Sequence, residues 1–316
     1  EYLALLLTST FGMNLMASAA DVLMLYLAVE ITAIPLFILA AFHFKQQKSV
    51  EAGLKYFLFG AMTSTVMVFA FSLLYGVSGQ TSYSGIAAAL KPGALPLGMA
   101  VGVFALALVG FLFKVSAAPF HFWAPDVYEG APTPIAGFLS TASKAAGFAA
   151  LLRVLHEVFG ASPELRFGLL AAAAVASMLL GNLLALRQKN IKRLLAYSSI
   201  AQAGYILVGA AVGTPLGASG AVYYLMAYLV TNLAAFGVVA VVSRGTGSDE
   251  VAAFSGLHRR NPSLALVLGV ALLSLGGVPV FAGFFGKFLV FASAVQAGAV
   301  WLAVVGVLNA VVGLYY

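Results

Sequence analysis

The sequence predicts an all-α polytopic membrane protein of about ten transmembrane helices, and three observations lead to this fold class. Hydrophobic residues make up 62% of the 316 residues and charged residues only 8%, whereas soluble domains carry about 25% charged residues. Apolar stretches of about 20 residues, each long enough to cross a bilayer core, recur from end to end. Prolines interrupt two of the longest stretches. So little charge cannot coat a water-facing surface.

The composition also excludes several kinds of site. Cysteine is absent, which excludes disulfides, thiolate metal sites, iron–sulfur clusters and thiol nucleophiles in this chain. The formal charge is +6, but the basic residues lie mainly in short loops, which favours membrane topology and lipid contact over nucleic-acid binding. No signal-peptide pattern is present. Because the chain begins at Glu1 and ends at Tyr316 inside a helix, we expect a fragment of a longer protein.

Two of the expected helices, 98–124 and 262–296, are too long for a simple span. Each contains a proline, Pro119 or Pro279, which removes a backbone hydrogen bond and should break or kink the helix. Broken helices survive in a membrane only where they pack in protein or line a wet cavity. The ten expected helices are 3–19, 22–42, 52–76, 98–124, 133–158, 167–186, 194–213, 218–242, 262–296 and 298–316.

Local signals mark two helix starts and one long loop. Thr133-Pro134 and Asn261-Pro262 are typical of an N-cap followed by proline at the first helical position. The segment 77–97 is rich in glycine, serine and proline, and we expect it to be the longest loop on its side.

Counting basic residues predicts the orientation. The loops 43–51, 125–132, 187–193 and 243–261 share one side and carry nine Lys or Arg, whereas the other side carries two, Lys91 and Arg166. The positive-inside rule places the Lys- and Arg-rich loops in the cytoplasm.

The ten helices divide into two sets of five, residues 1–160 and 161–316, and the proline-broken helix is the fourth of each set. An odd number of spans turns the second set upside down relative to the first. This pattern predicts two inverted five-helix repeats, a common plan in transporters.

Five ionisable residues fall inside the expected spans. A charge near the bilayer centre costs roughly 2.5–3.5 kcal/mol, so together they cost on the order of 10 kcal/mol. We therefore expect them to be paired or in contact with water, and to be functional. The five residues are Glu30, Lys55, Lys114, Lys144 and Lys287.

Lysine is the residue type that suits proton transfer. Burial disfavours the charged form of a lysine, and a nearby carboxylate favours it. Making and breaking a Glu–Lys pair can therefore move a lysine between holding and releasing a proton. Arginine stays protonated, and Arg153, near a helix end, is essentially the one arginine in the spans.

Several of these residues have a structural reading as well. Glu30 and one lysine could form a static salt bridge, and Lys55, near the start of its helix, could reach the cytoplasmic interface. His121, beside Pro119, is either a relay member or part of a capped break. Tyr197, Ser198 and Ser199 could line a water path, although hydroxyls in membrane helices usually satisfy the backbone. Asp126 and Glu129 are expected to shape and cap a turn.

Three segments carry a resemblance to a known family. They are FKVSAAPFHFWAPDVYEGAPTPIAGFLSTASKAAGF, NIKRLLAYSSIAQAGYILVG and GVPVFAGFFGKFLVF. Together they resemble the antiporter-like membrane subunits of respiratory complex I, across essentially the whole chain. Within that family, LKYFLFGA, TASKAAGF and the lysine of GFFGKF are most similar to the subunit N branch of bacterial NADH:quinone oxidoreductase.

The resemblance implies a fold and a set of site residues. The fold would be two inverted five-helix repeats, each with a broken helix, cut from an antiporter-like protein of about fourteen helices. Glu30 would match the family's fifth-helix glutamate. The family's lysines on the sixth, seventh, eighth and twelfth helices would correspond to Lys55, Lys114, Lys144 and Lys287.

The resemblance also implies a mechanism. Quinone reduction elsewhere in the complex would move Glu30 relative to Lys114, and protons would pass through Lys144 to Lys287. The chain would be a non-redox membrane subunit of a bacterial inner-membrane translocase, with no cofactor of its own. NADH, FMN, iron–sulfur clusters and quinone would belong to partner subunits, and its direct partners would be other membrane-arm subunits, including a neighbouring antiporter-like subunit and small membrane subunits. Two alternatives stay open: a subunit of a multi-subunit cation/proton antiporter, and a structural spacer.

Overall fold

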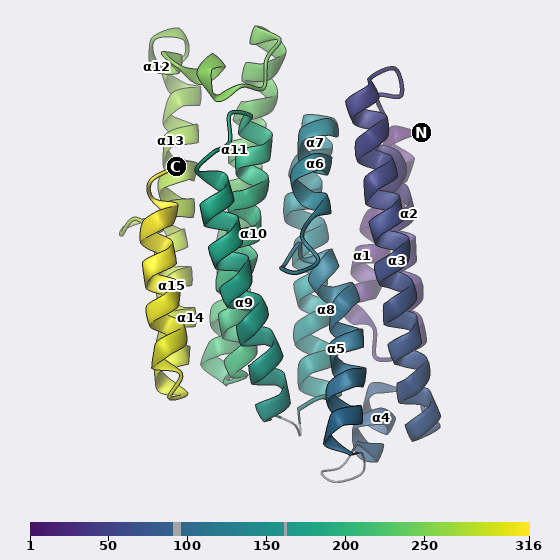
Figure 1. The fold of residues 1–316 in the computed structure, drawn as a ribbon. Helices are drawn as coiled ribbons and strands as arrows, with labels where there is room; N and C mark the ends of the chain where they lie inside the picture. The colour runs from purple at the N-terminus through teal and green to yellow at the C-terminus, as the bar shows by residue number, and fades with distance from the viewer. Residues whose placement is uncertain (91–95, 161–162) are drawn as a thin grey trace.

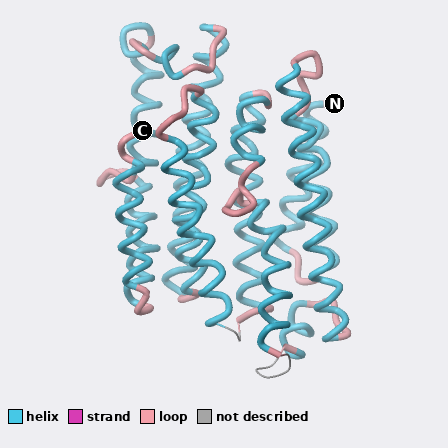
Figure 2. The backbone as a smooth tube through the Cα atoms, viewed as in Figure 1, coloured by secondary structure: helices cyan, strands magenta, loops and turns pink. Residues whose placement is uncertain are grey.

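The computed structural model describes residues 1–90, 96–160 and 163–316. Its helices form one elongated bundle in which the long axes run roughly alongside one another (Figure 1), and short loops join them (Figure 2). Six helices of the described part are long and apolar enough to cross a membrane, and five shorter apolar helices accompany them. The chain is therefore a multi-pass membrane protein.

The first half of the chain packs at one side of the bundle, from the N-terminus to the residues around Glu157 (Figure 1). A π-helical turn, η1, interrupts the last long helix of this half. The elements are α1 (Tyr2–Ser18), α2 (Val22–Ala40), α3 (Gln47–Ser78), α4 (Tyr83–Ala89), α5 (Leu97–Lys114), α6 (Trp123–Gly130), α7 (Thr133–Phe138), η1 (Leu139–Ser143) and α8 (Lys144–Glu157).

The second half begins at α9 and ends at the other side of the bundle. Within it α10 is buried along nearly its whole length, because it packs against α9, α11, α14 and also α6 of the first half. The elements are α9 (Pro163–Ala185), α10 (Ile191–Val212), α11 (Pro215–Thr246), the 3₁₀ turn η2 (Val251–Phe254), α12 (Leu257–Arg260), α13 (Pro262–Gly276), α14 (Ala282–Gln296) and α15 (Val300–Gly313).

Close helix contact depends on glycine at the α9–α10 interface. A Cβ atom at Gly181 would lie 2.5 Å from the backbone nitrogen of Ala201, and one at Gly204 would lie 2.8 Å from the carbonyl oxygen of Ala174. Small residues let membrane helices approach in this way, since packing rather than hydrophobic burial holds them together in lipid.

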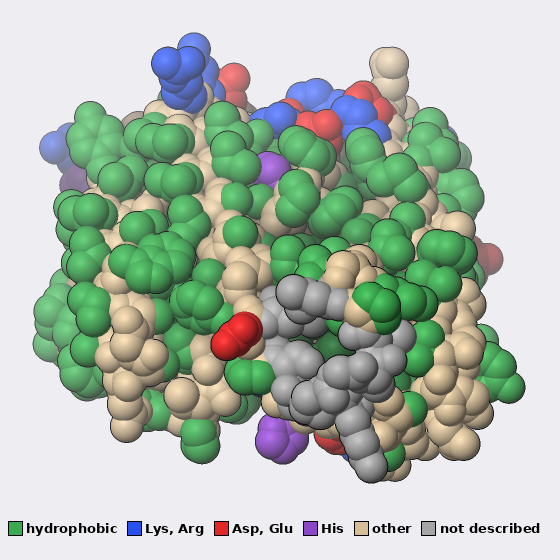
Figure 3. Space-filling model, turned by 60° about the horizontal axis from the view of Figure 1, so that its bottom comes forward, with side chains coloured by type: hydrophobic (Ala, Val, Ile, Leu, Met, Phe, Trp, Pro, Cys, Tyr) green, Lys and Arg blue, Asp and Glu red, His purple; other side chains and the backbone are tan. Residues whose placement is uncertain are grey.

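The loops that carry most of the charge gather at one end of the bundle. The Ile191 N–H donates to Asp249 O at 2.8 Å and the Val251 N–H to Lys189 O at 2.7 Å, which joins two of these loops. Lys48, on α3, reaches Glu129 at the same end. In Figure 3 hydrophobic side chains cover most of the visible face, and most Lys and Arg side chains lie along one rim.

Both expected breaks are present in the structure. Helix α5 ends at Lys114 and α6 begins at Trp123, while α13 ends at Gly276 and α14 begins at Ala282. Each gap contains its proline and a non-glycine residue with positive φ, Ser116 at 57° and Val280 at 86°. Such backbone is costly for a β-branched residue such as valine and persists only where the surroundings determine it.

Side chains satisfy the backbone groups that the first break exposes. The Ala118 N–H donates to Ser177 Oγ at 2.8 Å, and the indole N–H of Trp123 donates to Phe113 O at 3.1 Å. At the second break the Gly283 N–H donates to Ser274 Oγ at 3.2 Å. Without such partners these groups would be unsatisfied in a medium that lacks water.

Three expectations about local structure were wrong. Residues 125–132 were expected as a loop, but 123–130 form helix α6, because Pro125 falls in its first turn, where no intrahelical N–H partner is needed. Thr133 lies inside α7 and Pro132 precedes it as the cap residue. The 77–97 segment contains the end of α3 and helix α4, and Lys91 lies outside the described residues. Asn261 does cap α13, since its side chain accepts from the Leu264 N–H at 3.1 Å.

Candidate functional site

Lys144 is fully buried, and its hydrogen-bond partners are neutral groups. It begins α8 directly after the π-helical turn, an irregularity frequent at functional sites. Its Nζ donates to Ser199 O at 2.8 Å and also to the hydroxyl of Ser199. Its ammonium lies 5.8 Å from the centre of the Tyr228 ring. Hydroxyl and carbonyl oxygens, rather than a carboxylate, therefore surround this charge.

Lys287 is buried against the second helix break. Its Nζ donates to Leu275 O at 2.9 Å and to Gly276 O at 2.8 Å. These are the last carbonyls of α13, which have no intrahelical partner and lie at the negative end of the helix dipole. The ring of Tyr205 lies 4.7 Å from the same ammonium. The break thus supplies the binding site of the lysine.

Glu30 and Lys114 form no ion pair within 4.0 Å among the described residues. Lys114 is the last residue of α5, and its buried Nζ has no hydrogen-bond partner; Oε1 of Glu30 on α2 is also buried and unpartnered. Gly147 of α8 makes room for the lysine, since a Cβ there would lie 3.0 Å from Lys114 Cγ. A static salt bridge between the two is absent from this structure.

The three further relay candidates lie in different places. His121 is buried in the gap between α5 and α6, and its Nδ1 has no partner. Ser198 is buried and borders a cavity of about 200 Å³ together with Gln202 and Tyr316. Tyr197 is only partly buried, and its ring lies 6.0 Å from the guanidinium of Arg193.

Lys55 differs from the other four intramembrane candidates. Its side chain is 36% exposed and forms salt bridges with Asp126 at 2.6 Å and with Glu51 at 2.7 Å. The structure therefore separates Lys55 from the enclosed lysines and places it in a group of surface charges.

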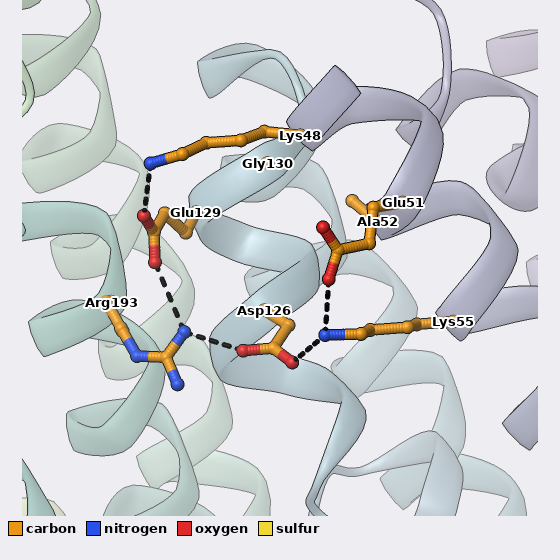
Figure 4. A pocket seen from close by; sticks show the side chains of 8 residues that line it. All are labelled: Lys48, Glu51, Ala52, Lys55, Asp126, Glu129, Gly130 and Arg193. Atoms are coloured by element: carbon orange, nitrogen blue, oxygen red, sulfur yellow. Dashed lines mark hydrogen bonds and ion pairs between the residues drawn. The ribbon is translucent and has the colours of Figure 1, made fainter. Parts of the chain in front are cut away.

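This group joins three helices (Figure 4). Arg193 of α10 bridges both acidic residues of α6, reaching Asp126 at 2.6 Å and Glu129 at 3.1 Å. Lys48 of α3 approaches Glu129 at 2.9 Å. We call the six residues that border this small pocket and exchange ion pairs the ion-pair cluster: Lys48, Glu51, Lys55, Asp126, Glu129 and Arg193.

The two carboxylates of α6 are stabilised in their charged form. Burial raises the pKa of the Asp126 carboxyl, but hydrogen bonds from Lys55 and Arg193 outweigh it and hold the pKa below its ordinary value. Glu129 shows the same balance with Lys48 and Arg193. Helix α6 is outside the helices that are long and apolar enough to span a membrane. These two residues lie within a helix and form ion pairs with α3 and α10.

Sequence reasoning missed Gln202, which lies one turn beyond Ser199 on α10. Its Nε2 donates at 3.1 Å to Leu275 O, the carbonyl that also accepts from Lys287. Residues three apart share a helix face, so α10 presents the partner of Lys144 and a neighbour of Lys287 side by side. An amide in an otherwise apolar stretch was the signal that could have found it.

Sequence reasoning also missed Asn232 of α11, another amide in an apolar stretch. It donates to Ser140 Oγ at 2.6 Å and to the Tyr228 hydroxyl at 3.0 Å. It thus fixes the ring that faces Lys144.

Comparisons with known proteins agree with this architecture. The family described as NADH:quinone oxidoreductase/Mrp antiporter, TM matches residues 19–313. The chain is 49% identical over 320 residues to NADH-quinone oxidoreductase subunit N of Moorella thermoacetica, covering 100% of this chain and 66% of that relative. It is 46% identical over 322 residues to NAD(P)H-quinone oxidoreductase subunit 2 of Nostoc punctiforme, covering 100% of this chain and 60% of the relative.

Two solved structures share the fold. A chain of respiratory complex I from Thermus thermophilus with bound aureothin superposes with a TM-score of 0.87 at 40% identity, covering 100% of this chain and 68% of that chain. A chain of the Mrp complex from Dietzia sp. gives a TM-score of 0.89 at 24% identity, covering 98% and 58%; at this identity the likeness concerns the fold alone. The chain spans 60% to 66% of the length of the curated relatives reported above.

Proposed function

This chain belongs to the NADH:quinone oxidoreductase/Mrp antiporter transmembrane family, and we propose that it is part of a proton-translocating membrane subunit of a complex I type enzyme. The observation that carries the proposal is a set of enclosed lysines that have no carboxylate partner among the described residues: Lys114, Lys144 and Lys287. A buried ammonium held by neutral oxygens loses its proton more readily than one in a salt bridge.

We infer the relay order Glu30, Lys114, Lys144 and Lys287 from the family resemblance, and contacts along α10 support its last step. Glu30, on α2, would act on the charge of Lys114 at the end of α5, and both groups have buried atoms without a hydrogen-bond partner among the described residues. A movement of α2 or α5 would therefore change the field at Lys114 without first breaking a hydrogen bond. Lys144 and Lys287 follow, linked along α10 by Ser199 and Gln202.

We assign the redox chemistry to partner subunits. The relatives are named as subunits of NADH- or NAD(P)H-quinone oxidoreductases, so quinone reduction in neighbouring subunits would supply the driving force. This chain contributes the proton path and no cofactor chemistry. The two halves, 1–160 and 161–316, would be inverted repeats, a proposal supported by the break in the fourth long apolar stretch of each. The charged rim would face the cytoplasm.

Replacing Lys114 or Glu30 by alanine tests the relay. In vesicles that contain the assembled complex, we expect Lys114→Ala and Glu30→Ala each to lower coupled proton pumping by about tenfold or more, since general acid–base groups typically contribute 10²–10⁴-fold. Lys45→Ala, an exposed lysine of the loop after α2, is the matched control. Undiminished pumping and quinone reduction in both variants would contradict the proposal.

A cation/proton antiporter subunit is the second candidate, because the family description includes Mrp antiporters. Purification of the full-length protein separates the two. Partners with flavin and iron–sulfur absorbance support the redox-driven pump, and sodium-dependent proton exchange by a complex without them supports the antiporter.

A further inference from the structure

The ion-pair cluster contains ion pairs that join the two halves of the chain. Arg193 belongs to the second half, whereas Asp126 and Glu129 belong to the first, and all three side chains are only 21% to 31% exposed. Exposed pairs contribute little to stability, but here each carboxylate receives two cations from two different helices (Figure 4). Such a network restrains α6 from both sides.

Arg193 lies at a position in α10 that is unfavourable for a cation, although its guanidinium also lies 6.0 Å from the ring of Tyr197 one turn later. It stands in the first turn, after the cap residue Asn190, where the helix dipole disfavours a cation. Its neighbour Lys192 stands there too and pairs with Asp249 at 3.1 Å. The acidic residues of α6 offset this cost by pairing with Arg193.

Helix α6 is the segment whose position depends on this cluster. It follows the break, so the eight residues between Lys114 and Trp123 separate it from α5. The backbone within the break is irregular and contains Ser116 at positive φ. A gap of this kind does not by itself fix the angle between the two pieces, so the hydrogen bond from Trp123 to Phe113 and the packing of α6 on α3 and α10 must do so. Lys55 adds a further contact through Asp126.

We propose that the ion-pair cluster is a clasp that holds α6 between α3 and α10, and that Lys55 is a positioning residue of this clasp, acting through Asp126 and carrying no proton itself. The proposal rests on the proposed function, because the clasp sets the geometry of the broken helix that ends in Lys114. It also assigns Lys55 a role different from that of the enclosed lysines.

The Lys55→Arg variant distinguishes a clasp from a relay. Arginine forms ion pairs with carboxylates but does not release its proton under these conditions. In vesicles with the assembled complex we therefore expect Lys55→Arg to pump at the parental rate, whereas Lys55→Met loses about two- to fivefold, as the loss of a partly exposed pair implies. Lys45→Met removes the same charge outside the cluster and should have no effect.

Lys114→Arg is the reference variant, because Lys114 is proposed to bind and release a proton and arginine cannot do so. If Lys55→Arg abolishes pumping as Lys114→Arg does, Lys55 is a relay member and the clasp proposal is wrong. If Lys55→Met pumps at the parental rate, the clasp is equally excluded. If both arginine variants still pump and Lys55→Met loses pumping, the clasp proposal stands. In that case the proposal that Lys114 transfers protons is wrong.

A second pair of variants covers the case in which Lys55→Met does not assemble. Arg193→Lys keeps a cation between the two carboxylates, and Arg193→Gln removes it. The clasp predicts that Arg193→Lys restores pumping relative to Arg193→Gln at equal amounts of assembled complex. Equal pumping by the two variants would contradict it.

Discussion

Lys144 and Lys287 donate hydrogen bonds to neutral acceptors, and the kind of acceptor decides how readily each lysine can release its proton. A carboxylate would fix each ammonium in its charged form, whereas a hydroxyl or a carbonyl lowers the cost of burial without binding the proton as strongly. Ser199 plays this part for Lys144, and the end of α13 plays it for Lys287. Lys114 has no hydrogen-bond partner at all within the described part of the chain.

At this scale Ser199→Ala tests the setting of Lys144. The change removes one acceptor and leaves the Ser199 backbone carbonyl, at a cost of about 1.5–3 kcal/mol for a hydrogen bond to a charged group. We expect coupled pumping to fall about tenfold or more. Ser293→Ala is the control, since Ser293 is also fully buried but donates only to Val290 O of its own helix. Equal pumping by the two variants would show that the hydroxyl contributes nothing.

At the scale of the element, a broken helix serves as a binding site as well as a defect. The free carbonyls of α13 accept from Lys287, and the Ser274 hydroxyl accepts from the Gly283 N–H in the first turn of α14. Thr231 of α11 lies 3.2 Å from the same Ser274 hydroxyl. The gap is therefore filled by polar groups from three segments, which is what a break at membrane depth requires.

Gly277→Ala tests this site. Gly277 has φ of 86°, and a Cβ there would lie 2.9 Å from Lys287 Cδ and 3.1 Å from its Nζ. Left-handed backbone costs a non-glycine residue roughly 1–2 kcal/mol, and the new methyl group would displace the ammonium. We expect lowered thermal stability and a loss of pumping.

Gly269→Ala, within the helix α13 that precedes Gly277, meets no atom within 4 Å and provides the control. It should be neutral or stabilise the helix by up to about 1 kcal/mol. Thermal unfolding in detergent and pumping in vesicles measure both effects. A Gly277→Ala variant that matches Gly269→Ala in both assays would refute the account of the second break.

At the scale of the whole molecule, the ion-pair cluster makes docking of α6 dependent on pH. The groups that face Asp126 and Glu129 from the packed helices are Lys48, Glu51 and Lys55 of α3 and Arg193 of α10. Because the pKa of each α6 carboxyl is lowered in the folded protein, its stabilising contribution is complete above the unfolded value of about 4. It is lost as pH falls through the lowered pKa.

We therefore expect the unfolding temperature in detergent to be constant from neutral pH to about pH 5 and then to fall by several degrees more than in an Asp126→Asn variant. The amide cannot titrate, so the variant starts lower and loses less on acidification. Parallel curves for the two proteins would contradict a role for Asp126 in this dependence.

The sequence by itself determined the class of fold and the residues that needed an explanation. Low charge and repeated apolar stretches require a membrane, Pro119 and Pro279 mark the breaks that the structure contains, and the lysines stand out because lipid makes them costly. These conclusions depend on composition and on neighbours in the sequence. The membership in the antiporter-like family, expected from the motifs, is confirmed over residues 19–313.

Only the tertiary structure decided which charges are paired. The hydrogen bond of Lys144 with Ser199 spans 55 positions, and that of Lys55 with Asp126 spans 71. No local pattern encodes such contacts, because helix packing and the course of the chain through the breaks bring the partners together. For that reason the sequence left open whether Lys55 is a relay lysine or reaches the interface, whereas the fold places it in a partly exposed cluster of ion pairs.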